Sequence, residues 1–347
     1  METLLGTLVL VSPLMLGILL SNFAARDPRL KVWAYVYLLL IYSLVALSGL
    51  ALIGVAFLIP IMVASGQVPA AAFDQIRGLD GAFVVAGPLL IAGAAAGSIV
   101  LAPPVRRFAA RLFPIQPDAI MDVTALSMTL AALGLAGANL AISAPLLTGM
   151  SDALAAQLRQ NSWWTLVTNL FTLLPPALLG VGLLIRRTPR EALERLGLTL
   201  RKPAQLLLVF PLALGLILLA LVVTSAWLAL DPRGYEEIGK LGNAVLGGLT
   251  GSGLLAAFAI GGIAGVSEET LFRGALQPKL GIVLPTLLFA LLHSQYLLSP
   301  ATALVLVLGF ALALVRRWTG STLICVLTHF LYNFMTVAIT LLQTPAR

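Results

Sequence analysis

Charged side chains are scarce in this sequence. They make up 10% of its 347 residues, whereas 60% are hydrophobic. A soluble domain usually carries roughly 25% charged residues, and no soluble fold of this length could bury so much apolar surface. The apolar residues occur in runs of about 20, each long enough to cross the roughly 30 Å hydrocarbon layer as a helix. The sequence therefore predicts an all-α, polytopic transmembrane helical bundle.

Cysteine and histidine are nearly absent. Cys325 is the only cysteine, so no disulfide framework is expected, and we interpret it as a small buried side chain. His293 and His329 are the only histidines. The first apolar run, residues 4–20, lacks a basic n-region and a small-residue cleavage site, which favours a retained first span over a removed signal peptide.

About ten segments are expected to span the membrane. A basic stretch at residues 186–203 separates an N-terminal block, 1–185, from a C-terminal block, 204–347. Leucines among the charges of this stretch favour a short amphipathic helix on the cytoplasmic surface. The expected spans are 3–24, 32–64, 82–103, 119–147, 163–185, 204–230, 246–278, 281–298, 300–315 and 321–343.

The basic residues predict the orientation of the chain. The net charge is +7, but Lys and Arg cluster in short loops between apolar runs, which indicates membrane orientation and no nucleic-acid binding. With the N-terminus outside, sixteen of the 21 Lys and Arg residues fall in the inner loops. We therefore expect an integral protein of a bacterial cell (inner) membrane, with its N-terminus outside.

Polar side chains inside apolar spans are costly and mark candidate functional sites. In the N-terminal block, Asp122 and Asn139 are interpreted as packing or interfacial residues. The C-terminal block holds three polar groups that are close enough in sequence to form one site. They are Glu268, Glu269 and Arg273; His293, four residues after Phe289; and His329 with Asn333.

The three polar groups are expected to lie at a similar depth in the membrane. At about 1.5 Å per residue, His293 lies about 18 Å and His329 about 12 Å from the inner ends of their spans. Glu269 lies about 14 Å deep only if its helix continues to Pro278. We therefore expect the longer helix, an ion pair between Glu269 and Arg273 at the i, i+4 spacing, and a polar cavity open to the cytoplasm.

The residue types suit hydrolysis of a peptide bond by an activated water. A carboxylate can act as the general base, a histidine can orient the water, and a second histidine with an amide can donate to an oxyanion. No serine or cysteine nucleophile stands beside a base. Two histidines and a glutamate could also bind Zn²⁺, but HExxH is absent and the metal stays open.

The segments SEETLFRG, FALLH and HFLYN resemble the EExxxR, FxxxH and HxxxN motifs of the CAAX-protease and bacteriocin-processing (CPBP, or Abi) family of intramembrane endopeptidases. The resemblance covers about residues 245–343, and RLGL before it is also similar to the family. It implies a membrane-embedded or membrane-associated protein or peptide as substrate. It further implies that Glu268 and His293 activate the water, that His329 and Asn333 form the oxyanion site, and that Glu269, Arg273 and Phe289 support them.

The sequence does not decide whether a metal cofactor is needed, and it leaves two alternative functions open. Family members are labelled metalloproteases, but the resemblance to the prenyl-protein branch favours a glutamate-activated water without an obligatory metal; a Zn²⁺ ion would use Glu268, His293 and His329. A non-proteolytic immunity or scaffold protein of the same fold is one alternative. A proton-coupled transporter is the other, and the lack of repeats and of polar residues in the N-terminal half argues against it.

Overall fold

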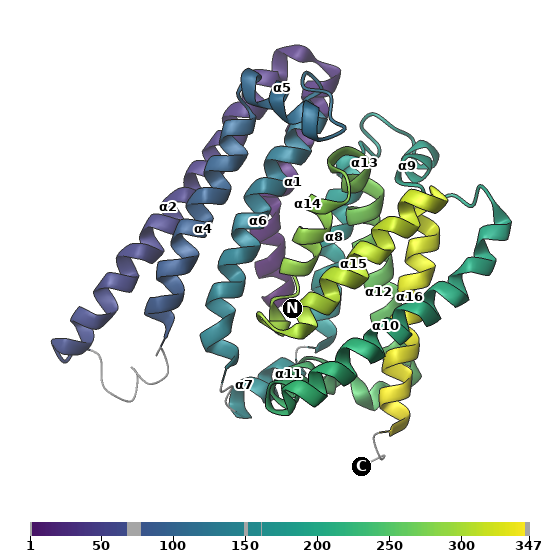
Figure 1. Ribbon diagram of the computed structural model, residues 1–347. Helices are drawn as coiled ribbons and strands as arrows, with labels where there is room; N and C mark the ends of the chain where they lie inside the picture. Colours follow the sequence, from purple (N-terminus) through teal and green to yellow (C-terminus); the bar gives the residue numbers. More distant parts are fainter. Residues whose placement is uncertain (1, 68–77, 149–151, 161, 344–347) are drawn as a thin grey trace.

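A computed structural model of the chain describes residues 2–67, 78–148, 152–160 and 162–343. Within these ranges every regular element is a helix, and the one strand-like contact is an isolated bridge between Leu183 and Arg187. Long helices of the N-terminal half stand beside those of the C-terminal half (Figure 1). The predicted all-α transmembrane bundle is confirmed.

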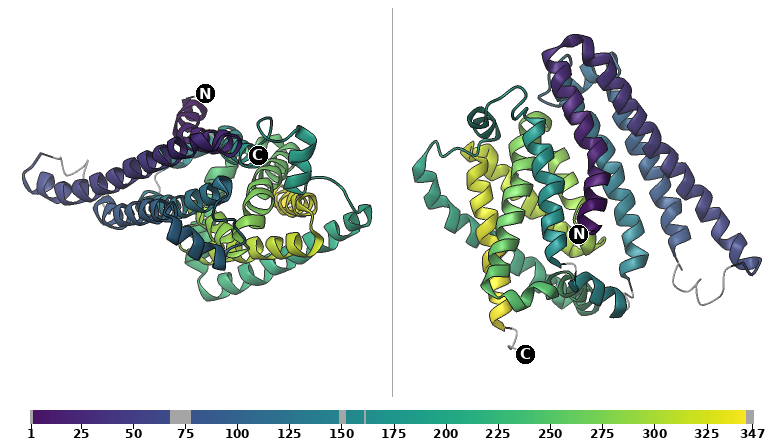
Figure 2. Two further views of the ribbon diagram at one scale, coloured as in Figure 1. Left: turned by 90° about the horizontal axis from the view of Figure 1, so that it is seen from above. Right: turned by 180° about the vertical axis from the view of Figure 1, so that it is seen from behind.

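The N-terminal half is built on three long helices that pack closely. A Cβ atom on Gly93 would lie 2.8 Å from Cα of Gly134, and one on Gly49 would lie 2.6 Å from the carbonyl oxygen of Gly87. Small residues that let backbones approach are a usual means of packing helices in membranes. Figure 2 shows two of the helices, α2 and α4, extending side by side away from the rest of the bundle. The elements are α1 (Glu2–Arg26), α2 (Lys31–Ala64), α4 (Leu79–Val100), α5 (Pro103–Leu112) and α6 (Ile120–Leu147).

Two helices of the C-terminal half, α12 and α16, approach each other through glycines. A Cβ atom on Gly261 would lie 2.7 Å from the carbonyl oxygen of Phe330, and one on Gly265 would lie 2.9 Å from that of Val326. This contact fixes the distance between the helices that carry the two outer polar motifs. The elements are α7 (Asp152–Gln160), α8 (Ser162–Gly180), α10 (Val209–Leu230), α11 (Pro232–Leu246), α12 (Leu254–Glu269), α14 (Val283–Leu291), α15 (Pro300–Thr319) and α16 (Thr322–Gln343).

The expected number of about ten spans is higher than the structure supports. Seven helices among the described residues are long and apolar enough to cross a membrane. The expected span at 281–298 is wrong, because α14 has only nine residues and would reach about 14 Å. The chain then turns at a short 3-10 helix, Ser294–Tyr296, and Leu297 has a left-handed φ of 52°.

The helix that carries both glutamates is the longer of the two alternatives, as predicted from depth. α12 continues without interruption through a π-helical segment, Thr270–Leu276, into α13, Gln277–Leu280. It ends at Gly281, whose φ of 70° suits glycine. π-Helical turns widen a helix locally and often occur at functional sites. Here the wide turn begins directly after Glu269.

The basic stretch contains the short helix α9, Pro189–Leu196. A capping box between Thr188 and Glu191 begins it, and Gly197 with φ 73° ends it. Leu196 is fully buried, and its carbonyl oxygen accepts a hydrogen bond from Thr322 at the start of α16. Arg195 donates to the carbonyl oxygen of Gly274 in the π-helical segment at 3.3 Å. The stretch therefore packs against the C-terminal helices.

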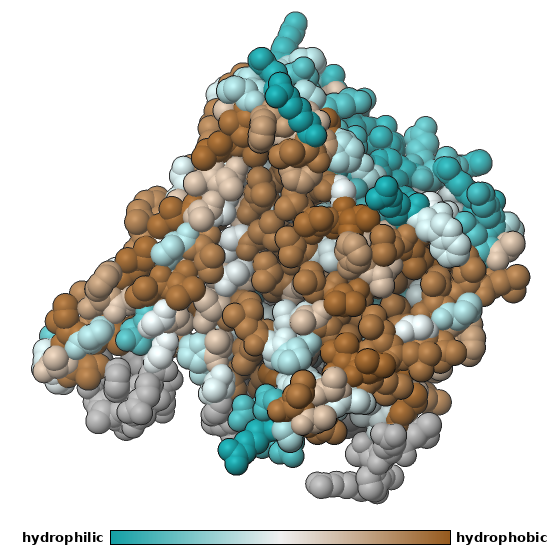
Figure 3. Space-filling view, viewed as in Figure 1, coloured by the Kyte–Doolittle hydropathy of each residue, from teal (hydrophilic) through white to brown (hydrophobic). Residues whose placement is uncertain are grey.

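Large apolar side chains cover most of the visible surface between the two ends of the bundle (Figure 3). Trp33, Leu207 and Leu230 are 67%, 81% and 86% exposed. Hydrophilic residues gather at the end where α5 and α9 lie, which is also where the predicted inner loops meet. A belt of exposed apolar residues bounded by polar ends is the surface of an integral membrane protein.

Candidate active site

The two adjacent glutamates are buried at the junction of α12 and the π-helical segment. Glu268 is 6% exposed and Glu269 is fully buried. Each has a different set of partners, because neighbouring residues point about 100° apart around a helix. A buried carboxylate is costly unless it is paired or hydrogen-bonded, so the partners of each glutamate indicate its role.

Glu269 lies at the centre of a buried charged cluster. Its Oε1 atom accepts a hydrogen bond from Arg273 at 3.2 Å and lies 2.8 Å from Nδ1 of His329. Arg273 is only 1% exposed, and it also donates to the carbonyl oxygen of Gly309 at 2.8 Å. Its guanidinium group lies 4.6 Å from the centre of the Phe289 ring. The structure thus contains the ion pair that the i, i+4 spacing indicated, and it adds His329 as a second partner.

Glu268 has a much less complete set of partners. Its Oε1 atom accepts a hydrogen bond of 3.4 Å from the side-chain amide of Asn169 in α8. Its Oε2 atom, like that of Glu269, is buried and has no hydrogen-bond partner among the described residues. Glu268 also lies near enough to Tyr296 and His329 to interact with them electrostatically. One carboxylate oxygen therefore stays available to a water or a substrate.

His293 does not lie on the helix that the FxxxH spacing suggested. It follows the end of α14 and occupies the first position of the turn to Ser294–Tyr296. Its Nδ1 atom lies 2.8 Å from the carbonyl oxygen of Phe289. Because a carbonyl can only accept, Nδ1 carries the proton and the Nε2 lone pair of a neutral ring is free. The Tyr296 ring stacks on the imidazole at 6.2 Å.

Phe289 packs between the polar groups. Its ring centre lies 4.8 Å from that of His293 and 6.4 Å from that of His329. Arg273 lies over the same ring. This one aromatic side chain therefore contacts a member of each of the three motifs, which explains why a large flat residue suits the position four before His293.

His329 and Asn333 lie four residues apart on α16, as expected for one helix face. His329 is 7% exposed. Its Nδ1 atom faces Glu269, which leaves Nε2 for another partner. The Asn333 side-chain amide makes no hydrogen bond to any residue in the described ranges. Both side chains therefore keep a polar atom free at the site.

Two asparagines of the N-terminal half bond to a motif residue or to its neighbour, and the sequence analysis did not assign either to the candidate site. Asn169 contacts Glu268, and Asn139 donates from its side chain to the hydroxyl of Ser294 at 2.8 Å. Asn139 was interpreted as a packing residue, and Asn169 was not singled out. An amide inside an apolar span was the available signal. Asp122, the other polar residue, accepts from Lys279 at 2.9 Å and so joins α6 to α13.

The proposed metal ligands do not form a ligand set. Among the described residues, no three His, Cys, Asp or Glu side chains lie together as a metal site requires. Nδ1 of His329 and Nδ1 of His293 face Glu269 and the Phe289 carbonyl oxygen, an arrangement that leaves Nε2 of each ring without a described partner. The conditional Zn²⁺ set of Glu268, His293 and His329 is not gathered into such a group in the described part of the chain, and no step of the chemistry below depends on a metal.

These features define a membrane-embedded helical protein in which Glu268, Glu269 and His329 are buried and His293 and Asn333 are partly buried. Residues 250–335 match the family described as Type II CAAX prenyl endopeptidase Rce1-like. The chain therefore carries a domain of the CPBP/CAAX protease family. Glu268, His293, His329 and Asn333 all lie inside the matched range, whereas Asn139 and Asn169 lie outside it.

One curated relative is similar to part of the chain. It is an uncharacterized protein, YpbD, of Bacillus subtilis (strain 168), which is 38% identical over 68 residues. These residues make up 19% of this chain and 36% of that protein, so the match spans about a third of the relative's length. No solved structure matches the chain.

Proposed function

We propose that this protein is an intramembrane endopeptidase that hydrolyses a peptide bond with a water activated by Glu268 and His293. The observation that carries the proposal is the pair of free acceptor atoms, Oε2 of Glu268 and Nε2 of His293, in a buried site of a CAAX-protease domain. Two acceptors can take both hydrogens of one water and so direct its oxygen lone pair at a substrate carbonyl.

In the first step, Glu268 removes a proton from the water while the oxygen attacks the carbonyl carbon. His293 keeps the water oriented, because its Nδ1–H is held by Phe289. The carbonyl π electrons move to the oxygen, which becomes an oxyanion. In the second step, the C–N bond breaks and the proton held by Glu268 is given to the leaving nitrogen. Atoms and charge balance without a covalent intermediate.

His329 and Asn333 are proposed to stabilise the oxyanion. The Asn333 amide is a free donor, and His329 can donate from Nε2 while Nδ1–H remains bonded to Glu269. A ring that donates from both nitrogens is an imidazolium, and Glu269 supplies the opposing negative charge. Arg273 in turn forms an ion pair with Glu269 at 3.2 Å. Glu269, Arg273 and Phe289 are therefore positioning residues in this proposal.

The proposed substrate is a membrane-embedded or membrane-associated protein or peptide. The site lies between helices whose outer surfaces are apolar, so a substrate enters from the bilayer or its surface. The bias of Lys and Arg supports a cavity that opens to the cytoplasm, with the N-terminus outside, in a bacterial inner membrane. Nucleic acid is not among the proposed partners. Whether the substrate carries a prenyl group is left to the experiment below.

Comparative membrane proteomics tests the proposal. Cells that produce the wild-type protein are compared with cells that produce Glu268→Gln or Glu268→Ala at the same level. We expect a substrate fragment to fall about 100-fold or more in both variants, the usual scale for loss of a general base. Glu237→Ala, an exposed acidic residue of α11, is the control and should cleave normally.

Two outcomes would contradict the proposal. Normal cleavage in both Glu268 variants would remove Glu268 as the base. Identical proteomes in all strains, together with an unchanged cellular phenotype, would favour a non-proteolytic scaffold or immunity protein. The same comparison with a chelator tests the Zn²⁺ hypothesis, since a metal-dependent enzyme would lose cleavage without any substitution.

A further inference from the structure

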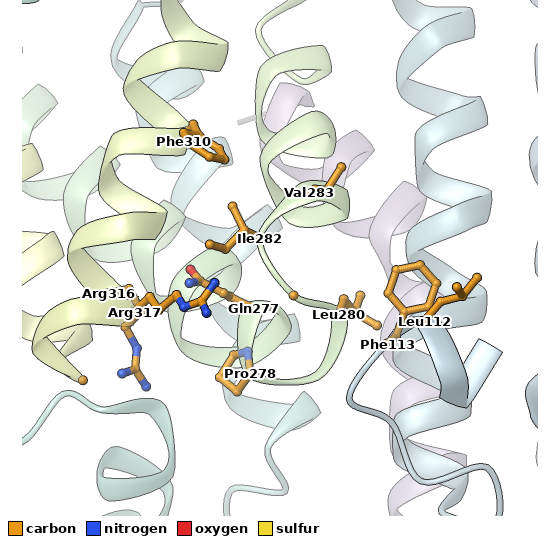
Figure 4. A pocket seen from close by; sticks show the side chains of 12 residues that line it. Leu112, Phe113, Gln277, Pro278, Leu280, Ile282, Val283, Phe310, Arg316 and Arg317 are labelled. Atoms are coloured by element: carbon orange, nitrogen blue, oxygen red, sulfur yellow. The ribbon is translucent and has the colours of Figure 1, made fainter.

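A concave site that neither glutamate lines lies at the basic end of the bundle. It has a volume of about 660 Å³ and lies between the end of α5, the α13–α14 turn and the end of α15. Pockets for small ligands usually measure roughly 300–1,000 Å³. Figure 4 shows Arg316 and Arg317 at one side of it, with Phe310 and Val283 further along the helices. The remaining lining residues include Leu112, Phe113, Gln277 and Ile282.

The two arginines of this pocket are not neutralised by a carboxylate. Within the described ranges, Arg316 donates to the carbonyl oxygen of Arg273 at 3.3 Å, and Arg317 is exposed. Neither guanidinium group forms an ion pair with a residue that the structure describes. Arg316 also lines a neighbouring cavity of about 250 Å³ together with Arg201, Lys202 and one carboxylate, Glu194, which pairs with Arg190. Four cations thus surround one small region.

The other walls of the pocket are apolar and open to the outside. Leu112, Val283 and Phe310 are 65%, 61% and 46% exposed. α15 and the helix that ends at Leu280 are both long and apolar enough to span the membrane, and the ends of both line the pocket. Trp318, which follows Arg317 in α15, is 70% exposed, and tryptophan is enriched at the interface between membrane and water. The pocket therefore offers cations at the polar boundary and apolar side chains towards the membrane interior.

We propose that this pocket binds an anionic phospholipid, with the headgroup phosphate at Arg316 and Arg317 and the acyl chains along Phe310 and Val283. Basic pockets between helices at the end of a bundle suit anionic headgroups, and arginine binds phosphate oxygens in a planar, two-donor geometry. A free phosphate would use the arginines alone, whereas a lipid also covers the exposed apolar wall.

The pocket is connected to the helix of the candidate active site. Arg316 contacts the backbone of Arg273, and Gln277 in the pocket lining donates to the carbonyl oxygen of Ala313 at 2.8 Å. A lipid bound here therefore rests on the segment that follows Glu268 and Glu269. Binding itself does not depend on the protein being a protease, and it is tested without an activity assay.

Native mass spectrometry of the purified full-length protein in detergent tests the proposal. The probes are phosphatidylglycerol and phosphatidylcholine with identical acyl chains, titrated separately. We expect the wild type to bind phosphatidylglycerol more tightly. The Arg316→Gln, Arg317→Gln double variant should lose about thirtyfold in affinity, which corresponds to about 1 kcal/mol for each cation. An Arg29→Gln, Lys31→Gln variant removes the same charge outside the pocket and should bind as the wild type does.

Further variants keep the proposal falsifiable. If the double variant does not fold, Arg317→Gln alone is used, because Arg317 is exposed and lacks an ion-pair partner in the described ranges. Equal affinity of the wild type and these variants for phosphatidylglycerol overturns the proposal. So does equal affinity of the wild type for both lipids. Complete displacement of phosphatidylglycerol by inorganic phosphate, with no loss in Phe310→Ser, would replace the lipid site by a simple phosphate site.

Discussion

Nδ1 of His329 lies 2.8 Å from Oε1 of Glu269, and the two residues, 60 positions apart, join α16 to α12 inside the bundle. The same oxygen accepts from Arg273. The cluster therefore holds together the helix of the EExxxR motif and the helix of the HxxxN motif. It also means that Oε1 of Glu269, the more deeply buried glutamate, has two structural partners, whereas Oε1 of Glu268 accepts one long hydrogen bond; Oε2 of each glutamate has no partner among the described residues.

Glu269→Ala should destabilise the protein far more than Glu268→Ala does. Removal of Glu269 leaves Arg273 as a buried charge without its carboxylate, which costs about 3–5 kcal/mol. Removal of Glu268 ends only one long hydrogen bond from Asn169 and should cost about 1 kcal/mol. Thermal unfolding of the two variants in the same detergent measures the difference. Equal losses would show that the pairing of Glu269 with Arg273 and His329 does not stabilise the fold.

Asn169→Ala should lower the turnover number of peptide cleavage by about fivefold and leave KM nearly unchanged. The amide positions Glu268 without forming part of the substrate pocket in our proposal, and the loss of one long hydrogen bond to a charged group is worth about 1 kcal/mol. Asn169→Asp has the same shape but turns a second carboxylate towards Glu268, so it should be the more damaging change. Steady-state kinetics on the substrate found by proteomics measure both.

The control for Asn169 is Ser127→Ala. It removes a buried hydroxyl of the N-terminal half, far along the chain from the motifs, that bonds to the Tyr42 hydroxyl at 2.7 Å and donates to the carbonyl oxygen of Gly97 at 2.8 Å. Ser127→Ala should lower stability and leave turnover unchanged. If Asn169→Ala and Ser127→Ala change turnover and stability in the same proportion, Asn169 is a packing residue and not a positioning residue.

The sequence predicted the helical bundle, the long glutamate helix and the pairing of Glu269 with Arg273, because each follows from composition or from the period of a single helix. It did not predict that His329 bonds to Glu269. Sequence spacing gives the face of a helix, but the contact depends on how closely α12 and α16 approach, which Gly261 and Gly265 determine.

The sequence also did not predict the turn that carries His293. Residues 281–298 are apolar over enough length to suggest a span, and no proline or glycine marks the end of α14 at Leu291. The helix ends because the following residues bond locally: the backbone N–H of Tyr296 donates to the carbonyl oxygen of His293, and Ser299 caps α15. Such local competition between a helix and a turn leaves no clear periodic signal.

Asn139→Ala and Ser294→Ala should each reduce turnover, and the double variant should lose no more than the larger single loss. The Asn139 amide donates to the Ser294 hydroxyl, and Ser294 follows His293 in the turn, so both substitutions release the same contact. A double-mutant cycle on the turnover number isolates this coupling. Additive losses would mean that the two residues act separately and that Asn139 does not hold the turn.

Gly93→Ala should destabilise the protein by about 1–3 kcal/mol, the usual cost of overpacking. The added Cβ would lie 2.8 Å from Cα of Gly134 and 3.0 Å from the carbonyl oxygen of Ala131, so α4 and α6 would have to separate. α6 also carries Asn139, and the same displacement should therefore reduce turnover as well as the melting temperature.

Gly54→Ala on α2 is the matched control, because a Cβ there meets no atom within 4 Å. Gly54→Ala should keep full turnover and melt at the same temperature or higher, since alanine favours a helix over glycine. A Gly93→Ala protein that melts as the wild type does would show that α4 and α6 can separate without cost, and the N-terminal helices would then not hold Asn139 in place.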